Sequence, residues 1–449
     1  MNRAASGALP SPPSPFRALR HRNFRLFFGG QLVSLIGTWM QSVAQSWLVY
    51  RLTGSSVLLG TVGFCSQIPV FVLAPLGGAA ADRYDRHRII VATQTASLVL
   101  AFALAALTLF THVTVWEILV LSALLGLVNA FDIPARQSFV VEMVGPSDLM
   151  NAIALNSSMF NGARIVGPAI AGLLVAAIGE GWCFAANAAS YIAVIAGLLL
   201  MTRTRRLATS KGSPVREIAE GFGYVKRTTP IKALLLLLGL VSLMGMPYAV
   251  LMPIFAEELL HGGARGLGIL MGASGLGALF GALMLTRRDG LAGLGRWIAL
   301  SCAGFGVSLV VFAFSRTLWL SAVLLVPVGF SMMVQMASSN TLIQSMVPDR
   351  LRGRVMAVYT MMFMGMAPLG ALLAGALAAR FGAPITVAAG GVMCVLGAGV
   401  FSVFLPRLRA EARQVIVALQ ESAGDPPGGV TGAVRPSVTS GASPVRAAP

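Results

Sequence analysis

The stretch LGGAAADRYDRHRII, residues 76–90, places seven mostly charged residues between two long apolar runs. Apolar runs of about 18 or more residues are long enough to cross the hydrocarbon core of a bilayer as helices. Charged side chains are costly inside that core, so residues 82–88 mark a water-exposed connector. The stretch therefore predicts two membrane-spanning helices joined by a short charged turn.

The composition of the whole chain agrees with a membrane protein. Of the 449 residues, 56% are hydrophobic and only 11% are charged, and the mean hydropathy is +0.79. These values lie far outside the balance of a soluble globular domain. Residues 1–15 lack the apolar run of a cleavable signal peptide, so we expect the first apolar segment to remain in the protein.

Similar apolar runs recur along the chain and predict an all-α membrane protein with twelve transmembrane helices. Their approximate ranges are 24–50, 56–81, 88–111, 114–134, 150–177, 181–201, 231–256, 267–286, 297–314, 317–345, 352–378 and 384–405. A polar linker at 202–230 separates a six-helix bundle at 24–201 from a second at 231–405. Residues 1–23 form an N-terminal segment, and the Pro-, Gly-, Ser- and Ala-rich tail at 406–449 is expected to be mostly disordered.

The two halves are similar where their fifth spans open. MVGPSDLMNAIAL begins at Met143, and MVPDRLRGRVMAV begins at Met346. This repeat predicts two parallel six-helix bundles around a central cavity, with a substrate bound near the midplane while the bundles rock against each other.

The connectors on the two sides of the membrane differ sharply in basic residues. The side of the termini carries Arg83, Arg86, Arg88, Arg136, Arg203, Arg205, Arg206, Lys211, Arg216, Lys226, Arg227, Arg287, Arg288, Arg296, Arg350, Arg352 and Arg354. The opposite side carries essentially Arg51, Arg265, Arg316 and Arg380. The positive-inside rule therefore predicts a multi-pass protein of the inner membrane with both termini in the cytoplasm. Because the net charge of +17 arises in these connectors, we expect no nucleic-acid partner.

The charged turn at 82–88 also has a specific pattern. A carboxylate at the carboxyl end of a helix opposes the helix dipole, so Asp82 needs either cationic neighbours, such as Arg83 and Arg86, or the amino terminus of another helix. Gly77 and Gly78 leave room for a second helix to approach closely. Taken singly, the arginines could simply anchor the connector on the cytoplasmic side.

The whole pattern resembles the signature of the major facilitator superfamily between spans two and three. The residues that match it are Gly78, Asp82, Arg83, Arg86 and Arg88, while Asp85 stands where many members have Gly. The resemblance covers about residues 16–406 and implies a conformational latch on the cytoplasmic side. Candidate partners from the second half are Arg350, Arg352 and Arg354, because the connector after span eight keeps Arg287 and Arg288 but lacks the Asp.

A second motif lies in span five, in NGARIVGPAIAG from Asn161. Its glycines recur every five residues and favour close helix packing, while its proline interrupts the helical hydrogen bonds. The motif resembles the Gly-Pro signature of the superfamily's exporters through Gly162, Gly167, Pro168 and Gly172. The chain is most similar to the subfamily of siderophore and macrolide exporters.

Polar side chains inside the spans are the candidate substrate-cavity residues. Arg164 is predicted to lie just past the midplane, where a charge costs at least ~2.5 kcal/mol. Thr38, Gln41 and Gln45 share one face of span one and either hydrogen-bond within the bundle or line an aqueous cavity. Because the superfamily's spans one, four, seven and ten line the pathway, the resemblance adds Asn129, Tyr248 and Gln335.

The residues proposed for coupling to protons are Asp132, Arg136, Glu142 and Arg164. Asp132 is expected to pair with Arg136 one turn on rather than with the distant Arg164. Proton-coupled drug antiporters of the superfamily usually carry an arginine four residues before a glycine in span four, where this sequence has Ser122 before Gly126. We therefore expect proton coupling, if it follows this pattern, to use Arg164 in place of that arginine, with Asp132 or Glu142 as the group that binds the proton.

Other function classes are weaker fits. No Gly-Lys dipeptide occurs, so the chain has no phosphate-binding loop of a nucleotide-driven pump. The cysteines lack metal-ligand spacing, and no metal or cofactor is expected. We predict a monomeric secondary transporter that exports an amphipathic small molecule by proton antiport. The alternatives are an uptake permease or facilitator, a membrane-embedded enzyme, or a non-transporting sensor.

Overall fold

The computed structural model describes residues 16–202, 214–286 and 290–423, and every regular element among them is a helix. The first half contains η1 (Arg17–Arg20), α1 (Arg22–Thr53), α2 (Ser56–Arg83), α3 (Arg86–Phe110), α4 (Val115–Ile178) and α5 (Glu180–Leu199). The linker contains α6 (Pro214–Arg227). The second half contains α7 (Thr229–Leu240), η2 (Val241–Gly245), η3 (Met246–Ala249), α8 (Met252–Ile254), η4 (Phe255–Leu259), α9 (Gly263–Thr286), α10 (Leu294–Ala313), α11 (Leu318–Ser345), α12 (Asp349–Phe381) and α13 (Ala383–Ala423). The predictions for 1–15, 203–213, 287–289 and 424–449 lie outside the described residues.

These helices form the predicted twelve-helix membrane fold. Within the described ranges, eleven helical segments are long and apolar enough to cross a membrane. The twelfth is α1, whose 32 residues span the distance but include several glutamines and serines. Large apolar side chains such as Phe102, Trp116 and Val403 remain more than half exposed on the outside of the bundles, as expected of a surface that faces lipid.

The fourth and fifth spans are joined without the charged loop that the sequence suggested. The helical assignment runs through α4 and is broken only at Gly145, whose φ of 70° favours glycine. The segment before it stays helical because Phe139, Val140 and Met143 are buried in a core cluster. Arg136 and Glu142 therefore lie on a helix and not in a connector.

The last helix is also longer than predicted. α13 continues to Ala423 through Pro406, whereas the twelfth span was expected to end at 405 and a mostly disordered tail to follow. Leu408, Ala412 and Ile416 recur every four residues and are buried against the second bundle. This apolar stripe stabilises the helix beyond the membrane-spanning part.

The seventh span is helical but irregular. It passes from α7 through the π-helix η2 and the 3₁₀-helix η3 to the π-helix η4. Pro247 and Pro253 lie in this segment, and proline cannot donate to the helical ladder. These two prolines explain why the hydrogen bonding of the seventh span is irregular.

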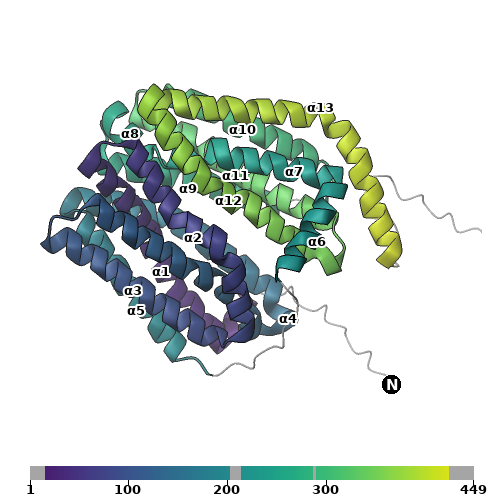
Figure 1. The fold of residues 1–449 in the computed structure, drawn as a ribbon, viewed down its shortest axis with the longest axis horizontal. Coiled ribbons are helices and arrows are strands. Elements are labelled where there is room, and N and C mark those ends of the chain that lie inside the picture. Colours follow the sequence, from purple (N-terminus) through teal and green to yellow (C-terminus); the bar gives the residue numbers. More distant parts are fainter. Residues whose placement is uncertain (1–15, 203–213, 287–289, 424–449) are drawn as a thin grey trace, which may run out of the picture.

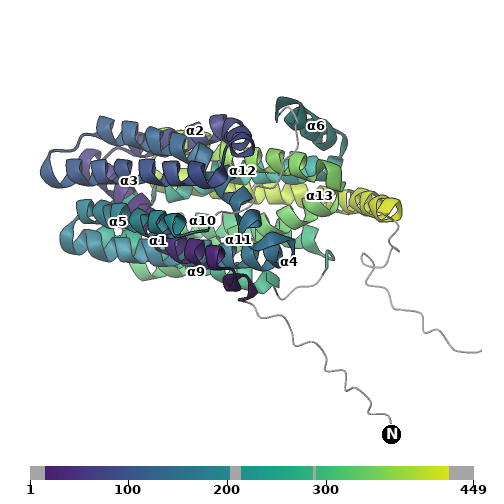
Figure 2. The same cartoon turned by 90° about the horizontal axis from the view of Figure 1, so that it is seen from below.

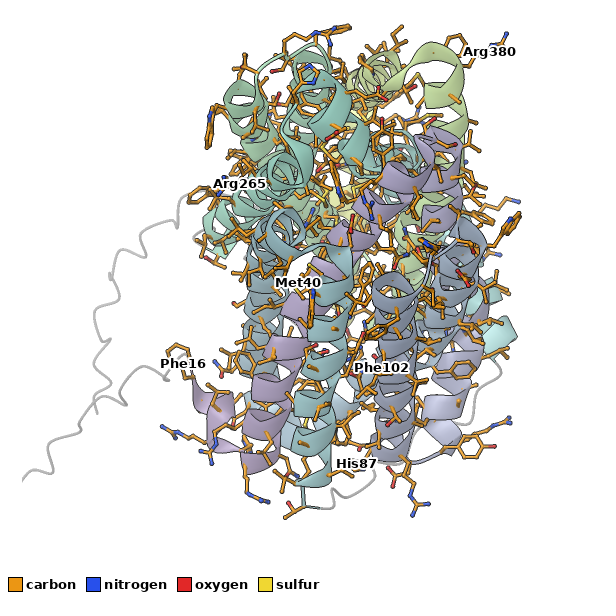
Figure 3. All side chains as sticks on the ribbon, turned by 90° about the vertical axis from the view of Figure 1, so that its left-hand side faces the viewer. Phe16, Met40, His87, Phe102, Arg265 and Arg380 are labelled. Atoms are coloured by element: carbon orange, nitrogen blue, oxygen red, sulfur yellow. The ribbon has the colours of Figure 1, made fainter. Side chains whose placement is uncertain are left out.

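The two bundles lie side by side and diverge toward one end (Figure 1). We call the end that carries η1, α6 and the last part of α13 the linker end, and the end that carries α8 the opposite end. The view in Figure 2 also places α6 and the last part of α13 at one end of the bundles. In Figure 3, His87 of the linker end lies at the bottom of the view, Met40 lies higher and Arg380 of the opposite end lies at the top.

Most of the contact between the bundles comes from two pairs of helices, α2 with α12 and α4 with α9. Ser56 Oγ donates a hydrogen bond of 3.0 Å to the carbonyl oxygen of Gly375. A Cβ added to Gly268 would lie 2.8 Å from the Cα of Gly172. Both contacts lie toward the opposite end, where the helix backbones of the two bundles approach each other closely.

Candidate functional site

Arg164 is a charged side chain near the middle of a membrane crossing, in the segment Ser147–Ile178 of α4. Its guanidinium carbon lies 5.8 Å from the ring centre of Trp39 in α1. Nη2 lies 3.8 Å from Sδ of Met332 in α11 of the second bundle. In the part of the chain that the structure describes, no carboxylate pairs with Arg164. The guanidinium therefore lies between the bundles, with no carboxylate partner among the residues that the structure describes.

Neighbouring residues fix the backbone around Arg164. Phe160, one turn earlier, meets Trp39 edge to face, with ring centres 5.7 Å apart. A Cβ added to Gly275 of α9 would lie 3.0 Å from the carbonyl oxygen of Arg164. The ring of Trp39 and the thioether of Met332 thus flank a cationic centre, which suits an amphipathic molecule with an anionic group.

The predicted polar face of span one is divided in the structure. Gln41 is buried, and its Oε1 accepts a hydrogen bond of 2.6 Å from Asn187 in α5. Gln45 Nε2 donates to Ser122 Oγ in α4 at 2.8 Å, while Thr38 is exposed and donates to the Ser34 carbonyl. Gln41 and Gln45 thus follow the first of the two alternatives, hydrogen bonds within the bundle.

The three candidates on other helices have different environments. Tyr248 is buried and hydrogen-bonds Ser274 of α9 at 2.8 Å, inside the second bundle. Gln335 of α11 is 2% exposed, and its Nε2 has no hydrogen-bond partner among the described residues. Asn129 is half-buried on α4. Of the predicted cavity residues, Arg164 is the one described above as reaching the other bundle, through its contact with Met332.

Three of the coupling candidates, Asp132, Arg136 and Glu142, take part in two ion pairs in the first bundle, toward the linker end. Asp132 pairs with Arg136, as predicted, and is 1% exposed. Its Oδ1 also accepts hydrogen bonds from Thr93 Oγ1 at 2.8 Å and from Gln94 Nε2 at 2.9 Å. These polar partners offset the desolvation of the carboxylate.

The second pair joins the charged turn to α4. Arg86 is 6% exposed and donates to Glu142 Oε1 at 2.7 Å and to the Ala81 carbonyl at 3.0 Å. Its contact with Asp82, at 3.4 Å, is longer. Arg86 is therefore held inside the first bundle, where it ties the turn between α2 and α3 to α4.

The remaining latch residues lie as follows. Arg83 and Arg88 are exposed. Arg354, one of the predicted partners from the second half, pairs with Glu220 of α6, so the linker helix docks on α12.

The close approach in this region occurs at Gly77 and not at the motif glycine Gly78. A Cβ at Gly77 would lie 2.0 Å from the Ala130 carbonyl, whereas one at Gly78 would meet nothing within 4 Å. Asp85, the departure from the family pattern, caps α3 by accepting from the Arg88 amide at 3.3 Å. A helix cap therefore explains the aspartate at that position.

Two of the three glycines in the span-five motif pack as predicted. A Cβ at Gly167 would lie 2.5 Å from Trp39 Cβ, and one at Gly172 would lie 2.9 Å from the Cα of Gly268. A Cβ at Gly162 would meet nothing within 4 Å, so close packing was wrong for that glycine. Pro168 lies within the helix, and a Cβ at Gly268 would lie 2.7 Å from its carbonyl oxygen.

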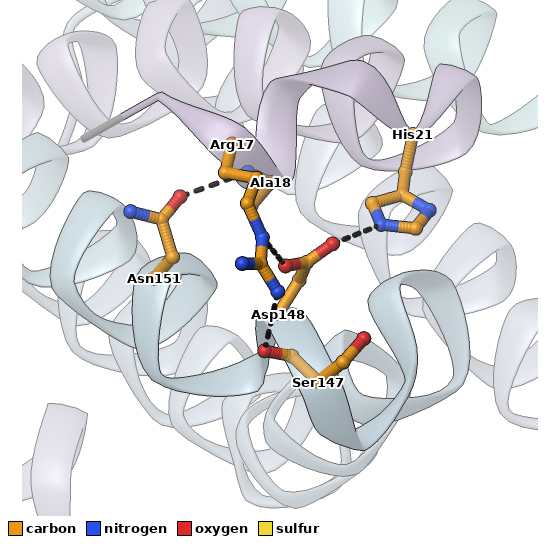
Figure 4. A network of polar contacts seen from close by, with 6 residues as sticks. All are labelled: Arg17, Ala18, His21, Ser147, Asp148 and Asn151. Atoms are coloured by element: carbon orange, nitrogen blue, oxygen red, sulfur yellow. Dashed lines mark hydrogen bonds and ion pairs between the residues drawn. The ribbon is translucent and has the colours of Figure 1, made fainter. Parts of the chain in front are cut away.

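The N-terminal η1 docks on the beginning of the fifth span (Figure 4). Asp148 pairs with Arg17 and accepts from His21 Nε2 at 2.8 Å. The Ala18 amide donates to Asn151 Oδ1 at 2.8 Å. This network fixes the entry to α1 against α4.

Replacing Asp148 by asparagine should release η1, because Arg17 and His21 both lose the carboxylate that they contact. We expect tryptic cleavage after Arg17 and Arg20 to become several-fold faster in the purified protein, measured by limited proteolysis and mass spectrometry. The control is Asp349→Asn, which removes an exposed carboxylate at the start of α12. Equal cleavage rates in the two variants would contradict the docking.

The sequence interpretation missed a contact between the bundles at the opposite end. Tyr50 Oη, at the end of α1, donates a hydrogen bond to Glu258 of η4. Nearby, Arg51 Nε donates to Glu180 Oε1 at 2.7 Å. The sequence does contain a sign that Glu258 is unusual. The chain has only 16 acidic residues, and two of them, Glu257 and Glu258, lie at the end of the seventh span.

Comparison with known proteins assigns the family. Residues 13–423 match the family described as transmembrane secretion effector, a branch of the major facilitator superfamily. The chain belongs to this family. It is a multi-pass membrane transporter and not an enzyme.

Several relatives of this transporter have described functions. It is 26% identical over 375 residues to the staphyloferrin A transporter of Staphylococcus aureus, covering 83% of this chain and 93% of that protein. It is 30% identical over 390 residues to the multidrug efflux pump Tap of Mycolicibacterium fortuitum, with the same coverage. The enterobactin exporter EntS of Shigella boydii is 24% identical over 371 residues, covering 83% and 89%. The transporter is thus related to siderophore and drug exporters.

Solved structures agree with the fold. A bacterial homologue of the lysosomal transporter Spinster matches with a TM-score of 0.64 at 14% identity, covering 91% of this chain and 99% of that one. A bacterial homologue of the iron transporter ferroportin matches with a TM-score of 0.65 at 16% identity, covering 85% and 98%. At these identities the likeness establishes the twelve-helix fold alone.

Proposed function

We propose that this transporter exports an amphipathic, anionic small molecule of the siderophore or drug class across the inner membrane by alternating access, driven by proton antiport. The observation that carries the proposal is Arg164. A guanidinium halfway through a span, without a carboxylate partner among the described residues, requires compensation that a substrate anion supplies. The siderophore and drug exporters among the relatives support the substrate class.

The direction of transport is proposed from the relatives and from membrane orientation. The linker end carries most of the basic residues, so we assign it to the cytoplasm, together with both termini. The bundles diverge toward this end (Figure 1), which supports a conformer that receives substrate from the cytoplasm. The Tyr50–Glu258 contact and the glycine contacts close the opposite end.

Proton coupling is assigned to the buried pairs near the linker end. Protonation of Asp132 or Glu142 would remove the charge that Arg136 or Arg86 faces and weaken the hold of α4 on its neighbours. Both carboxylates lie in the fourth span, before the break at Gly145, and Arg164 lies in the fifth span after it, so a proton and a substrate act on consecutive spans.

The proposal is tested with purified transporter in liposomes that are acidic inside. Enterobactin, staphyloferrin A and the cationic dye ethidium are added outside, and their accumulation is followed with and without a protonophore. We expect the gradient to drive accumulation of at least one siderophore, because proton exit is coupled to substrate entry. Transport that the gradient does not change would instead indicate a facilitator.

The Asp132→Asn variant separates coupling from binding. Substrate counterflow, which needs no net proton movement, should persist, while accumulation driven by the gradient should fall to the level seen with protonophore. The control Asp349→Asn removes an exposed carboxylate and should behave as wild type. Gradient-driven accumulation retained in Asp132→Asn would remove Asp132 from the mechanism.

A further inference from the structure

A separate cavity of about 390 Å³ lies at the linker end of the second bundle. Its walls come from α7, the start of α10, the end of α11 and the last part of α13. Leu234, Phe401, Leu405 and Leu408 supply apolar lining. This cavity contains none of the residues assigned to the substrate pathway.

The same cavity is lined by three arginines, Arg296 of α10 and Arg409 and Arg413 of α13. They make no ion pair with any residue that the structure describes. The nearest acid along α13, Glu411, pairs with Arg407 at 3.1 Å. The cavity therefore combines apolar walls with uncompensated positive charge.

The start of α10 adds to this charge. Gly293 and Gly295 line the cavity, and the N-terminus of this 20-residue helix has no side-chain cap. A Cβ at Gly295 would lie 3.8 Å from Nε of Arg409, so the arginine crosses the beginning of α10. The helix dipole favours an anion at the same place.

The lipid-facing surface continues from the cavity. Leu396, Val400, Val403 and Phe404 of α13 are more than half exposed and lie just before the arginine-bearing segment. An occupant with its charge on the arginines could thus lay hydrocarbon chains along α13. An inorganic anion would leave the apolar walls unused.

We propose that this cavity binds an anionic phospholipid of the cytoplasmic leaflet, with its phosphate on Arg296, Arg409 and Arg413 and its acyl chains against α13. Basic pockets between transmembrane helices on this side of a membrane suit such headgroups. Bound there, the lipid joins α10 to the extension of α13 and stabilises the linker end of the second bundle.

The test uses the full chain in nanodiscs of phosphatidylcholine, with or without one-fifth phosphatidylglycerol. Native mass spectrometry counts retained phosphatidylglycerol, and thermal unfolding reports its effect on stability. We expect wild type to retain phosphatidylglycerol and gain thermal stability from it. Arg409→Gln/Arg413→Gln should bind it about 30-fold more weakly, the effect of two interfacial arginines.

The matched control is Arg316→Gln/Arg380→Gln, which removes two exposed arginines from the opposite end and should bind as wild type. Arg413→Gln alone, at an exposed position, provides a milder variant if the double one does not fold. Retention of phosphatidylglycerol by all variants, equal loss in the control, or complete displacement of the lipid by millimolar inorganic phosphate would each overturn the proposal.

Discussion

Arg164→Met should abolish transport of siderophores while leaving the transporter at least as stable as wild type. Methionine fills a similar volume but offers no charge to a substrate anion. Truncating one partner of a desolvated charge pair costs about 2–5 kcal/mol, so transport at low substrate concentration should fall at least about 30-fold. The measurement is initial accumulation in proteoliposomes together with the unfolding temperature.

The stability measurement separates a functional arginine from a structural one. If Arg164 stabilised the folded protein through packing, its replacement by methionine would lower the unfolding temperature. An arginine that waits for a substrate is a cost to the empty protein, about 2.5 kcal/mol on membrane-insertion scales. Its removal should therefore raise the unfolding temperature or leave it unchanged. Arg380→Met, at the end of α12, controls for loss of one arginine.

Gly172→Leu should also abolish transport, for a different reason. The α4–α9 contact at Gly172 and Gly268 leaves no room for a side chain, so the bundles cannot close at the opposite end. Overpacking of this kind costs about 1–3 kcal/mol, which depopulates the closed conformer by roughly 5- to 160-fold. The measurement is the rate at which a thiol reagent labels a cysteine introduced at Thr38. This rate should differ between wild type and Gly172→Leu, because Gly172→Leu shifts the population between the two conformers.

The control for this prediction lies on the same helix. At Gly162 a Cβ would have no atom within 4 Å, so a side chain can leave the backbone there without a clash. Gly162→Leu should therefore transport and label as wild type does. Equal defects in the two variants would show that the glycine motif acts through helix formation and not through closure of the opposite end.

The sequence predicted the fold well because membrane insertion imposes long, apolar segments. The spans can be read directly from apolar runs such as those on either side of residues 82–88. The helix extensions before Gly145 and beyond Pro406 were missed, because their apolar stripes are short and interrupted by charged residues. Their stability comes from packing against other helices.

The candidate site was predicted only in part. The Asp132–Arg136 pair followed from helical spacing, and Arg164 stood out as a charge within a span. The partners of Gln41 and Tyr248 lie on α5 and α9, and no local pattern indicates such contacts. The rarity of acidic residues could single out Glu258, but its partner Tyr50 lies 208 positions away and no sequence pattern indicates that pairing.

The central claim, that Arg164 receives an anionic substrate between the bundles, is tested most directly by equilibrium binding to detergent-purified protein. Enterobactin, staphyloferrin A and ethidium are compared on wild type, Arg164→Met and Arg380→Met. We predict that wild type and Arg380→Met bind one of the siderophores with the same affinity, and that Arg164→Met binds it at least about 30-fold more weakly. Unchanged siderophore binding by Arg164→Met would contradict the account.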